Sequence, residues 1–250
     1  MKKAYLLLIM AAGIISCGCL SSPPKGDLIY CSYSRNGAAG LGKDYCELIA
    51  DVDSVPKVVV VMDEDNRFGD PVIHRSYQVD KSVVDSLSKL LSENKVYKLN
   101  GYHLDEAICG GYSYRIYQEY SSGDKVNAFW YGHGVKDSAL TAYAIIENFF
   151  TPWRERAVQE EKTEILVKRI SEMEQLYERV SKATRKRKTY PEFRDDVNKL
   201  RGYMDSGQWK EDYEADEKGE IPKDLKRGVL SQDGLYNLLQ SDRLFKLMCK

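Results

Sequence analysis

Residues Ser206–Leu239, SGQWKEDYEADEKGEIPKDLKRGVLSQDGLYNLL, decide the fold of the C-terminal part of the chain. Trp209 and Tyr213 stand four positions apart, which predicts that they share one face of a helix. A run of acidic residues follows and ends at Pro222, and Ser231 is typical of the residue that begins a helix. The stretch therefore predicts two short helices joined by a proline-containing turn.

The same stretch resembles a small bacterial family called domain of unknown function 4298. Its members carry the very similar string W-x-x-D-Y-E-x-D-E-x-G-x-x-P-x-D-L-x-R-G-V-L-S-x-D-x-x-Y-x-L-L. The resemblance covers roughly the last 90 residues of the chain and implies no established activity. The motif residues are Trp209, Asp212, Tyr213, Asp216, Glu217, Pro222, Arg227, Gly228, Ser231, Asp233 and Tyr236.

The acidic run invites comparison with a calcium loop. Asp212, Glu214 and Asp216 match the first, third and fifth positions of an EF-hand. Glu217 replaces the glycine that the sixth position needs, and Lys223 replaces the closing glutamate. We therefore predict that the acids pair with Lys223, Lys226 and Arg227 rather than with a metal.

A helical module is predicted over residues 154–250. Thr151–Trp153 is expected to end the preceding helix, because Pro152 lacks a backbone N–H. Residues 154–182 contain neither Gly nor Pro. Apolar residues then recur at steps of four and three, the rhythm of packed helices, at Leu166, Ile170, Met173, Tyr177 and Val180.

Residues 27–150 are expected to form an α+β domain, an antiparallel sheet with two helices on one face. Alternating patterns predict strands at 112–120 and 125–131, joined by a turn. Apolar residues at helical spacing predict a helix over 81–94, with Asp80 as its cap. The continuous run Val58–Val61 predicts a central strand covered on both faces.

The first residues, MKKAYLLLIMAAGIIS, have the basic start and short apolar segment of a signal peptide. Ser16–Cys17 resembles a bacterial lipobox, which implies lipidation at Cys17 and removal of residues 1–16. Residues 17–26 would then form a tether, and acyl chains would attach the protein to a membrane. This predicts a cell-envelope lipoprotein, in the outer membrane where two membranes exist.

Two cysteines of the sheet region have two interpretations. Export would permit a disulfide between Cys31 and Cys46, which lie in two candidate neighbouring strands. The alternative is that each thiol is a small buried apolar group.

Complete catalytic, cofactor or metal motifs are not found in the sequence. The glycine-rich segment 37–43 fails as a phosphate loop because Asp44 follows Lys43. His103 with Asp105, Glu106 and Cys109 would suit an acid–base or metal site only if folding gathered them. A net charge of −1 does not produce the positive potential that would attract nucleic acid, so no nucleic-acid partner is expected.

The sequence therefore favours a non-enzymatic envelope protein whose helical module contacts a protein partner. The alternative is an envelope hydrolase or a small-ligand- or glycan-binding lipoprotein. It would use a tyrosine-rich sheet face, since the chain has 18 tyrosines against 6 phenylalanines.

Overall fold

The chain divides into two compact units, Met1–Ala157 and Val158–Lys250. The computed structural model describes residues 22–38, 42–51, 54–63, 72–106 and 110–249. The predicted signal peptide, Cys17 and Cys109 lie outside these ranges. Among the helices within them, none is both long enough and apolar enough to cross a membrane.

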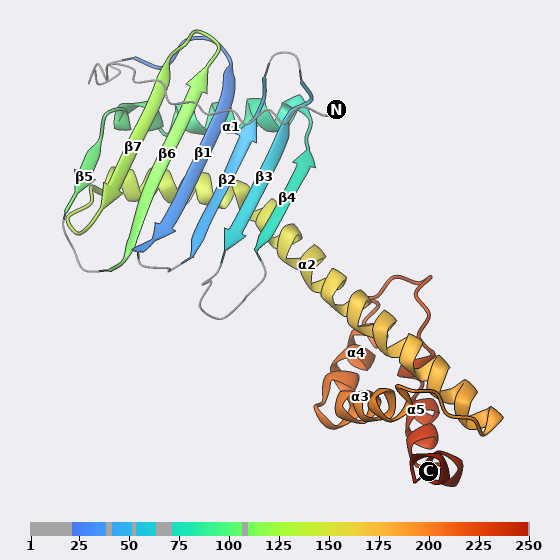
Figure 1. The fold of residues 1–250 in the computed structure, drawn as a ribbon. Coiled ribbons are helices and arrows are strands. Elements are labelled where there is room, and N and C mark those ends of the chain that lie inside the picture. Colours follow the sequence, from blue (N-terminus) through green and yellow to red (C-terminus); the bar gives the residue numbers. More distant parts are fainter. Residues whose placement is uncertain (1–21, 39–41, 52–53, 64–71, 107–109, 250) are drawn as a thin grey trace, which may run out of the picture. The chain divides into compact units, whose positions relative to one another are not determined.

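The first unit is built on a seven-stranded sheet in the order β4-β3-β2-β1-β6-β7-β5 (Figure 1). All neighbours are antiparallel except β5 and β7, which run parallel. This confirms the predicted α+β class. The strands are β1 (Leu28–Gly37), β2 (Lys43–Ile49), β3 (Lys57–Asp63), β4 (Ile73–Gln78), β5 (His103–Asp105), β6 (Tyr112–Tyr120) and β7 (Lys125–Tyr131).

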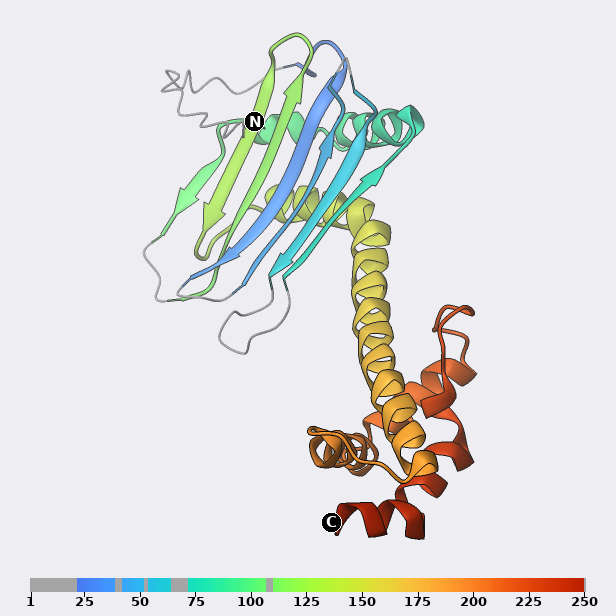
Figure 2. The ribbon, with the colours of Figure 1, turned by 45° about the vertical axis from the view of Figure 1, so that its right-hand side comes forward.

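Two helices cover one face of this sheet. Helix α1 (Lys81–Glu93) and the first part of α2 (Asp137–Lys186) lie on the same side of it in both views (Figures 1 and 2), and a short 3-10 turn, η2 (Val96–Leu99), follows α1. The strands alternate, so one set of side chains is buried beneath the helices, including Trp130, Tyr33 and Ile116. Asp80 occupies the cap position of α1, but its side chain forms no capping bond.

The valine run was predicted as a central strand covered on both faces, and the predicted cover is wrong, because the described helices lie on one face of the sheet only. Strand β3 is second from the edge, and β1 is the middle strand. Val58 and Val60 are fully buried on the helix-covered face, Val59 is buried on the other face, and Val61 is half-buried. A continuous apolar run reports burial on both faces, but it does not report the position of the strand in the sheet.

The disulfide interpretation of Cys31 and Cys46 is also wrong, because both thiols are free and buried. The register pairs Cys31 with Leu48 and Cys46 with Tyr33, so the two cysteines are diagonal neighbours rather than opposite ones. Diagonal neighbours lie about 7–8 Å apart, which exceeds the reach of a disulfide. The alternative interpretation, two small buried groups, describes them.

Helix α2 does not end at Thr151–Trp153 as predicted, because Pro152 lies inside it. The first part of the helix carries Ala139, Ile146 and Phe150 into the sheet core. The later part carries Ile170, Leu176 and Val180 into a separate core. Burial on both sides of the proline thus keeps the helix continuous despite one missing N–H.

The second unit packs short helices against the later part of α2. They are α3 (Phe193–Asp205), α4 (Gln208–Glu217), the 3-10 turn η3 (Gly228–Leu230), α5 (Gln232–Leu239) and α6 (Asp242–Met248). Ser231 precedes a helix as predicted, and leucines at 235, 238, 239, 244 and 247 predict that this helix is the last one. The chain instead forms two helices here, and the Ser241 side chain caps the second at the Leu244 N–H. The core of this unit contains Phe193, Leu200, Leu235 and Leu244.

Candidate functional sites

Of the predicted cluster around His103, Asp105 shares strand β5 with it, Glu106 follows that strand, and Cys109 lies outside the described residues. His74 and His103 lie on β4 and β5, the two opposite edges of the sheet. The His103 ring is exposed and stacks on Phe129 at 5.2 Å. Glu106 instead accepts a hydrogen bond from the backbone N–H of His133 at 2.9 Å. Among the described residues, no three His, Cys, Asp or Glu side chains are placed to hold a metal.

The sheet face opposite the helices is the first candidate surface, called here the open face. No described helix covers it (Figures 1 and 2). The strand register places five half-buried aromatic side chains on it: Tyr30, Tyr45, Tyr117, Phe129 and Tyr131. The predicted tyrosine-rich sheet face is therefore present.

Carboxylates accept hydrogen bonds from two of the tyrosine hydroxyls of the open face, those of Tyr30 and Tyr117. Tyr30 donates to Glu47 at 2.6 Å, and Tyr117 donates to Glu119. Burial, followed by the bond to Glu47, raises the pKa of Tyr30, so its hydroxyl stays protonated. The hydrogen bond from Lys125, followed by that from Tyr117, lowers the pKa of Glu119. These bonds fix the rings in place and leave their faces partly open to solvent.

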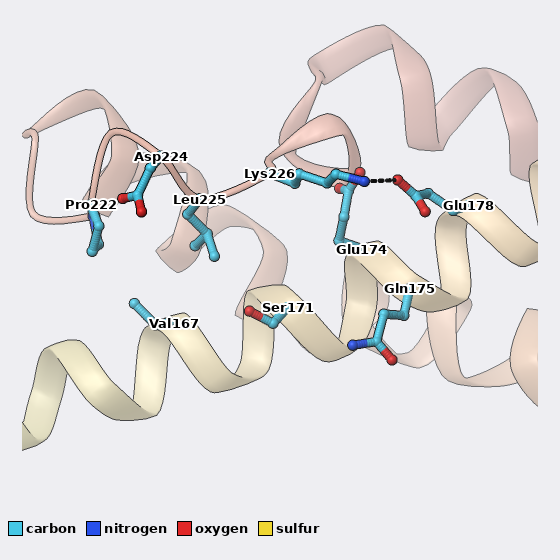
Figure 3. A pocket seen from close by; sticks show the side chains of 9 residues that line it. All are labelled: Val167, Ser171, Glu174, Gln175, Glu178, Pro222, Asp224, Leu225 and Lys226. Carbon is cyan, nitrogen blue, oxygen red and sulfur yellow. Dashed lines mark hydrogen bonds and ion pairs between the residues drawn. The ribbon is translucent and has the colours of Figure 1, made fainter.

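The second candidate site is a groove of about 450 Å³ in the second unit (Figure 3). One wall is α2, and the other is residues 218–227, which we call the groove loop. Figure 3 shows the two sets of side chains approaching each other across the groove. The lining residues are Val167, Ser171, Glu174, Gln175 and Glu178 of α2 and Pro222, Asp224, Leu225 and Lys226 of the groove loop.

Motif residues hold the groove loop in one conformation. Arg227 forms an ion pair with Asp216 of α4. The same guanidinium donates to the carbonyl of Pro222 at 2.7 Å and to that of Leu225 at 3.2 Å. Gly219 starts the loop with φ of +74°, a conformation that favours glycine. One arginine thus donates hydrogen bonds to two carbonyls of the groove loop, which lie outside any helix or strand and so lack the regular partners of those elements.

Glu174 and Trp209 hold the segment that follows the groove loop. The Glu174 carboxylate, 7% exposed, accepts the Val229 N–H at 2.6 Å. The Trp209 indole donates to the Val229 carbonyl at 2.9 Å. A Cβ on Gly228 would lie 2.9 Å from Glu174 Oε1, so a larger residue there would require the carboxylate to shift. Trp209 and Gly228 of the string therefore have a structural role in the second unit.

The acidic run is only partly paired as predicted. Asp212 is fully buried and bound by Arg169 of α2, with Nε distances of 3.0 and 3.1 Å, and by Tyr203 Oη at 2.7 Å. Of the three predicted cations, Arg227 pairs with the run, whereas Lys226 pairs with Glu178 of α2 at 3.0 Å. Because the run lies on α4, its carboxylates project around a helix rather than into a loop.

The remaining motif residues have plainer positions. Tyr213 stacks on Trp209 at 5.3 Å, as their spacing predicted. Glu217 and Asp233 are exposed, and Ser231 precedes α5 without a side-chain capping bond. Tyr236 is 54% exposed, whereas the other two motif aromatics, Trp209 and Tyr213, are half-buried.

Sequence reasoning missed the α2 wall of the groove. The predicted apolar stripe, which includes Leu166, Ile170 and Met173, faces the core of the second unit. Val167, Ser171 and Glu178 lie next to that stripe on the helix surface and line the groove. The available signal was Val167, an apolar residue placed off the stripe.

A family model described as Domain of unknown function (DUF4298) matches residues 170–249. The match confirms the resemblance of the C-terminal module and covers α3 to α6 with the later part of α2. No curated protein matches the chain.

Proposed function

We propose that the protein is a non-enzymatic, lipid-anchored cell-envelope protein whose helical module binds a protein partner in the groove. The observation that carries the proposal is the fixed groove loop. Arg227, Gly228 and Glu174 hold an irregular segment rigidly beside α2, and preformed concave surfaces on rigid supports are typical of binding sites.

The sequence supports the anchor. Lys2 and Lys3, the apolar segment and Ser16–Cys17 follow the order of a lipoprotein signal. Two backbone contacts are consistent with a tether that ends before β1. The Lys25 N–H donates to Asp124 at 2.8 Å, and the Asp27 N–H donates to Ser121 Oγ at 2.8 Å. These bonds connect residues 25–27, where the proposed tether would end, to the turn between β6 and β7.

Palmitate labelling tests the anchor. Replacing Cys17 by alanine should abolish incorporation of labelled palmitate and release the protein from the membrane fraction. The matched control is Cys19→Ala, which should leave both unchanged. Labelling that persists in Cys17→Ala and disappears in Cys19→Ala would move the lipidation site to Cys19. Absence of labelling in the unsubstituted protein would refute the anchor.

Site-specific photo-crosslinking tests the groove. A benzophenone amino acid at Ser171 lies in the groove, whereas the same group at Glu172 lies on the exposed surface of α2. We expect a discrete crosslinked protein from position 171 and none from position 172. The adduct should disappear when Leu225→Arg removes apolar surface and places a positive charge in the groove. Equal crosslinking from both positions, or none from either, would contradict the proposal.

The open face supports a second candidate function, glycan binding. Aromatic rings that are half-exposed and fixed by hydrogen bonds can stack on the C–H faces of sugars, and Glu47 and Glu119 could accept sugar hydroxyls. An N-acetylglucosamine oligomer is a suitable probe. We expect binding that Tyr117→Ala weakens and Tyr236→Ala, in the other unit, leaves unchanged. No binding would remove this candidate. The hydrolase alternative is not proposed, because the Glu106 carboxylate is already bound by the His133 backbone N–H.

A further inference from the structure

The charges that line the groove are unequal. Glu174, Glu178 and Asp224 contribute three carboxylates, and Lys226 is the single cation among the lining residues. Glu174 is the buried one, and among the described residues none forms a salt bridge with it. Its one hydrogen bond, from the Val229 N–H, leaves carboxylate lone pairs unused.

The rest of the lining is apolar or neutral. Val167, Pro222 and Leu225 provide hydrocarbon surface, and Ser171 and Gln175 provide neutral polar groups. Figure 3 shows Glu174 and Glu178 projecting from α2 toward Lys226, at one end of this apolar surface. A ligand that matches both the apolar lining and the two carboxylates needs a hydrocarbon stem that ends in a cation. Lysine and arginine side chains have this form.

We propose that the groove accepts a lysine or arginine side chain of the partner protein, whose cation displaces Lys226 from Glu178 and lies between Glu178 and Glu174. This inference rests on the proposed function and specifies the chemistry of the partner. Lys226 then acts as an internal competitor that occupies the site until the partner binds.

Replacement of Lys226 by the partner's cation is favoured because Lys226 and Glu178 are exposed, whereas Glu174 is buried. The Lys226 and Glu178 side chains are 76% and 54% exposed, and such exposed pairs contribute little to stability. Breaking this pair therefore costs little. A cation that reaches Glu174 gains more, because charges interact more strongly where protein excludes water. The hydrocarbon stem adds apolar burial against Leu225 and Pro222.

Three short peptides test the charge requirement on the full chain. Each has the form acetyl-Ala-Leu-X-Leu-Ala-amide, with X as lysine, norleucine or glutamate. Norleucine keeps the hydrocarbon stem and removes the cation. We expect the lysine peptide to shift backbone amide resonances of residues 171–178 and 222–229, and we expect the other two peptides to shift none of them.

Two substitutions should change affinity for the lysine peptide in opposite directions. Glu178→Gln should weaken binding about two- to fivefold, and Lys226→Gln should strengthen it by a similar factor because the internal competitor is gone. A merely structural disturbance would weaken binding in both variants. Glu172→Gln, an exposed carboxylate of α2 outside the groove, is the matched control and should change nothing.

The inference is overturned if the norleucine or glutamate peptide binds as well as the lysine peptide, if none binds, or if Lys226→Gln weakens binding. These results leave the proposed function separately testable. A crosslink at position 171 together with a failed charge test would retain the binding groove and discard the cationic side chain.

Discussion

At the scale of single residues, Gly228 shows why part of the motif string is fixed. Its missing Cβ lets the Glu174 carboxylate reach the Val229 N–H, and this contact ends the groove loop. The glycine is not needed for an unusual backbone angle, since its φ is not in the left-handed range. A close approach of two groups, rather than backbone freedom, explains the residue.

Gly228→Ala should destabilise the second unit by about 1–3 kcal/mol, because the new Cβ overlaps the carboxylate. Gly202 on α3 is the control, since a Cβ there meets nothing within 4 Å. Gly202→Ala should stabilise the unit by about 0.5–1 kcal/mol through helix propensity. Urea unfolding measures both, and a neutral Gly228→Ala would contradict the role given to the close approach.

The buried thiols make a prediction about alkaline pH. Burial raises the pKa of Cys31 to about 12, and burial also raises that of Cys46 to about 11. An unfolded thiol ionises near pH 8.5. The folded pKa is the higher one, so the stabilisation is complete below pH 8.5 and is lost as pH rises toward 11. The free energy of unfolding should therefore fall with pH, by at most about 1.4 kcal/mol per pH unit for each thiol.

Urea unfolding of the first unit between pH 8.5 and 10 measures this slope. Cys31→Ala should reduce it, and Cys249→Ala should not, because Cys249 is exposed. An unchanged slope in Cys31→Ala would show that other groups cause the pH dependence.

At the scale of elements, the chain leading into β1 is fastened to the turn between β6 and β7. Gly26 has φ of +77°, and a Cβ there would overlap Ser121 Oγ and lie 2.9 Å from the Ser122 N. Gly123 has a similar φ of +88° with nothing within 4 Å. A side chain at Gly123 would therefore meet backbone strain alone, whereas one at Gly26 would meet both backbone strain and steric overlap.

Both Gly26→Ala and Gly123→Ala should cost about 1–2 kcal/mol for the left-handed backbone. Only Gly26→Ala should also detach residues 22–27, since the overlap displaces the Ser121 and Asp124 contacts. Hydrogen exchange at the Lys25 and Asp27 amides measures the detachment. Equal exchange in the two variants would contradict this fastening.

Helices and strands were predictable where the hydrophobic residues follow one regular period. The helix at 81–94 and the strands at 112–120 and 125–131 have regular periods, and they form at almost the predicted residues. The break at Pro152 was predicted wrongly, because burial of Phe150 and Ala157 outweighs the local effect of proline. The division of the last helix into α5 and α6 was missed, since leucines continue across it.

At the scale of the whole molecule, the two units have separate cores. The buried residues of the first core lie between Leu28 and Ala157, and those of the second lie between Ile170 and Leu247. The contacts of Asp212 lie within the second unit, on α2 and α3. The units are therefore expected to unfold in separable transitions.

Asp212→Asn should lower the stability of the second unit by about 2–4 kcal/mol, because Arg169 and Tyr203 lose their buried carboxylate. The first unit should be unaffected. Residue-resolved hydrogen exchange, read at β1 and at α3, measures the two separately. Arg201→Gln, an exposed charge on α3, is the control and should change neither. A parallel loss of protection at β1 would show a single cooperative unit.

The sequence by itself determined the α+β class, the existence of a helical C-terminal module and the shared helical face of Trp209 and Tyr213, because each depends on period or spacing along the chain. Only the tertiary structure decided that Cys31 and Cys46 stay apart, that β1 is the middle strand and that Arg169 holds Asp212. It also decided that Glu174 and the groove loop form one groove. These features depend on strand register and on contacts between residues far apart in sequence, and local patterns carry no information about either.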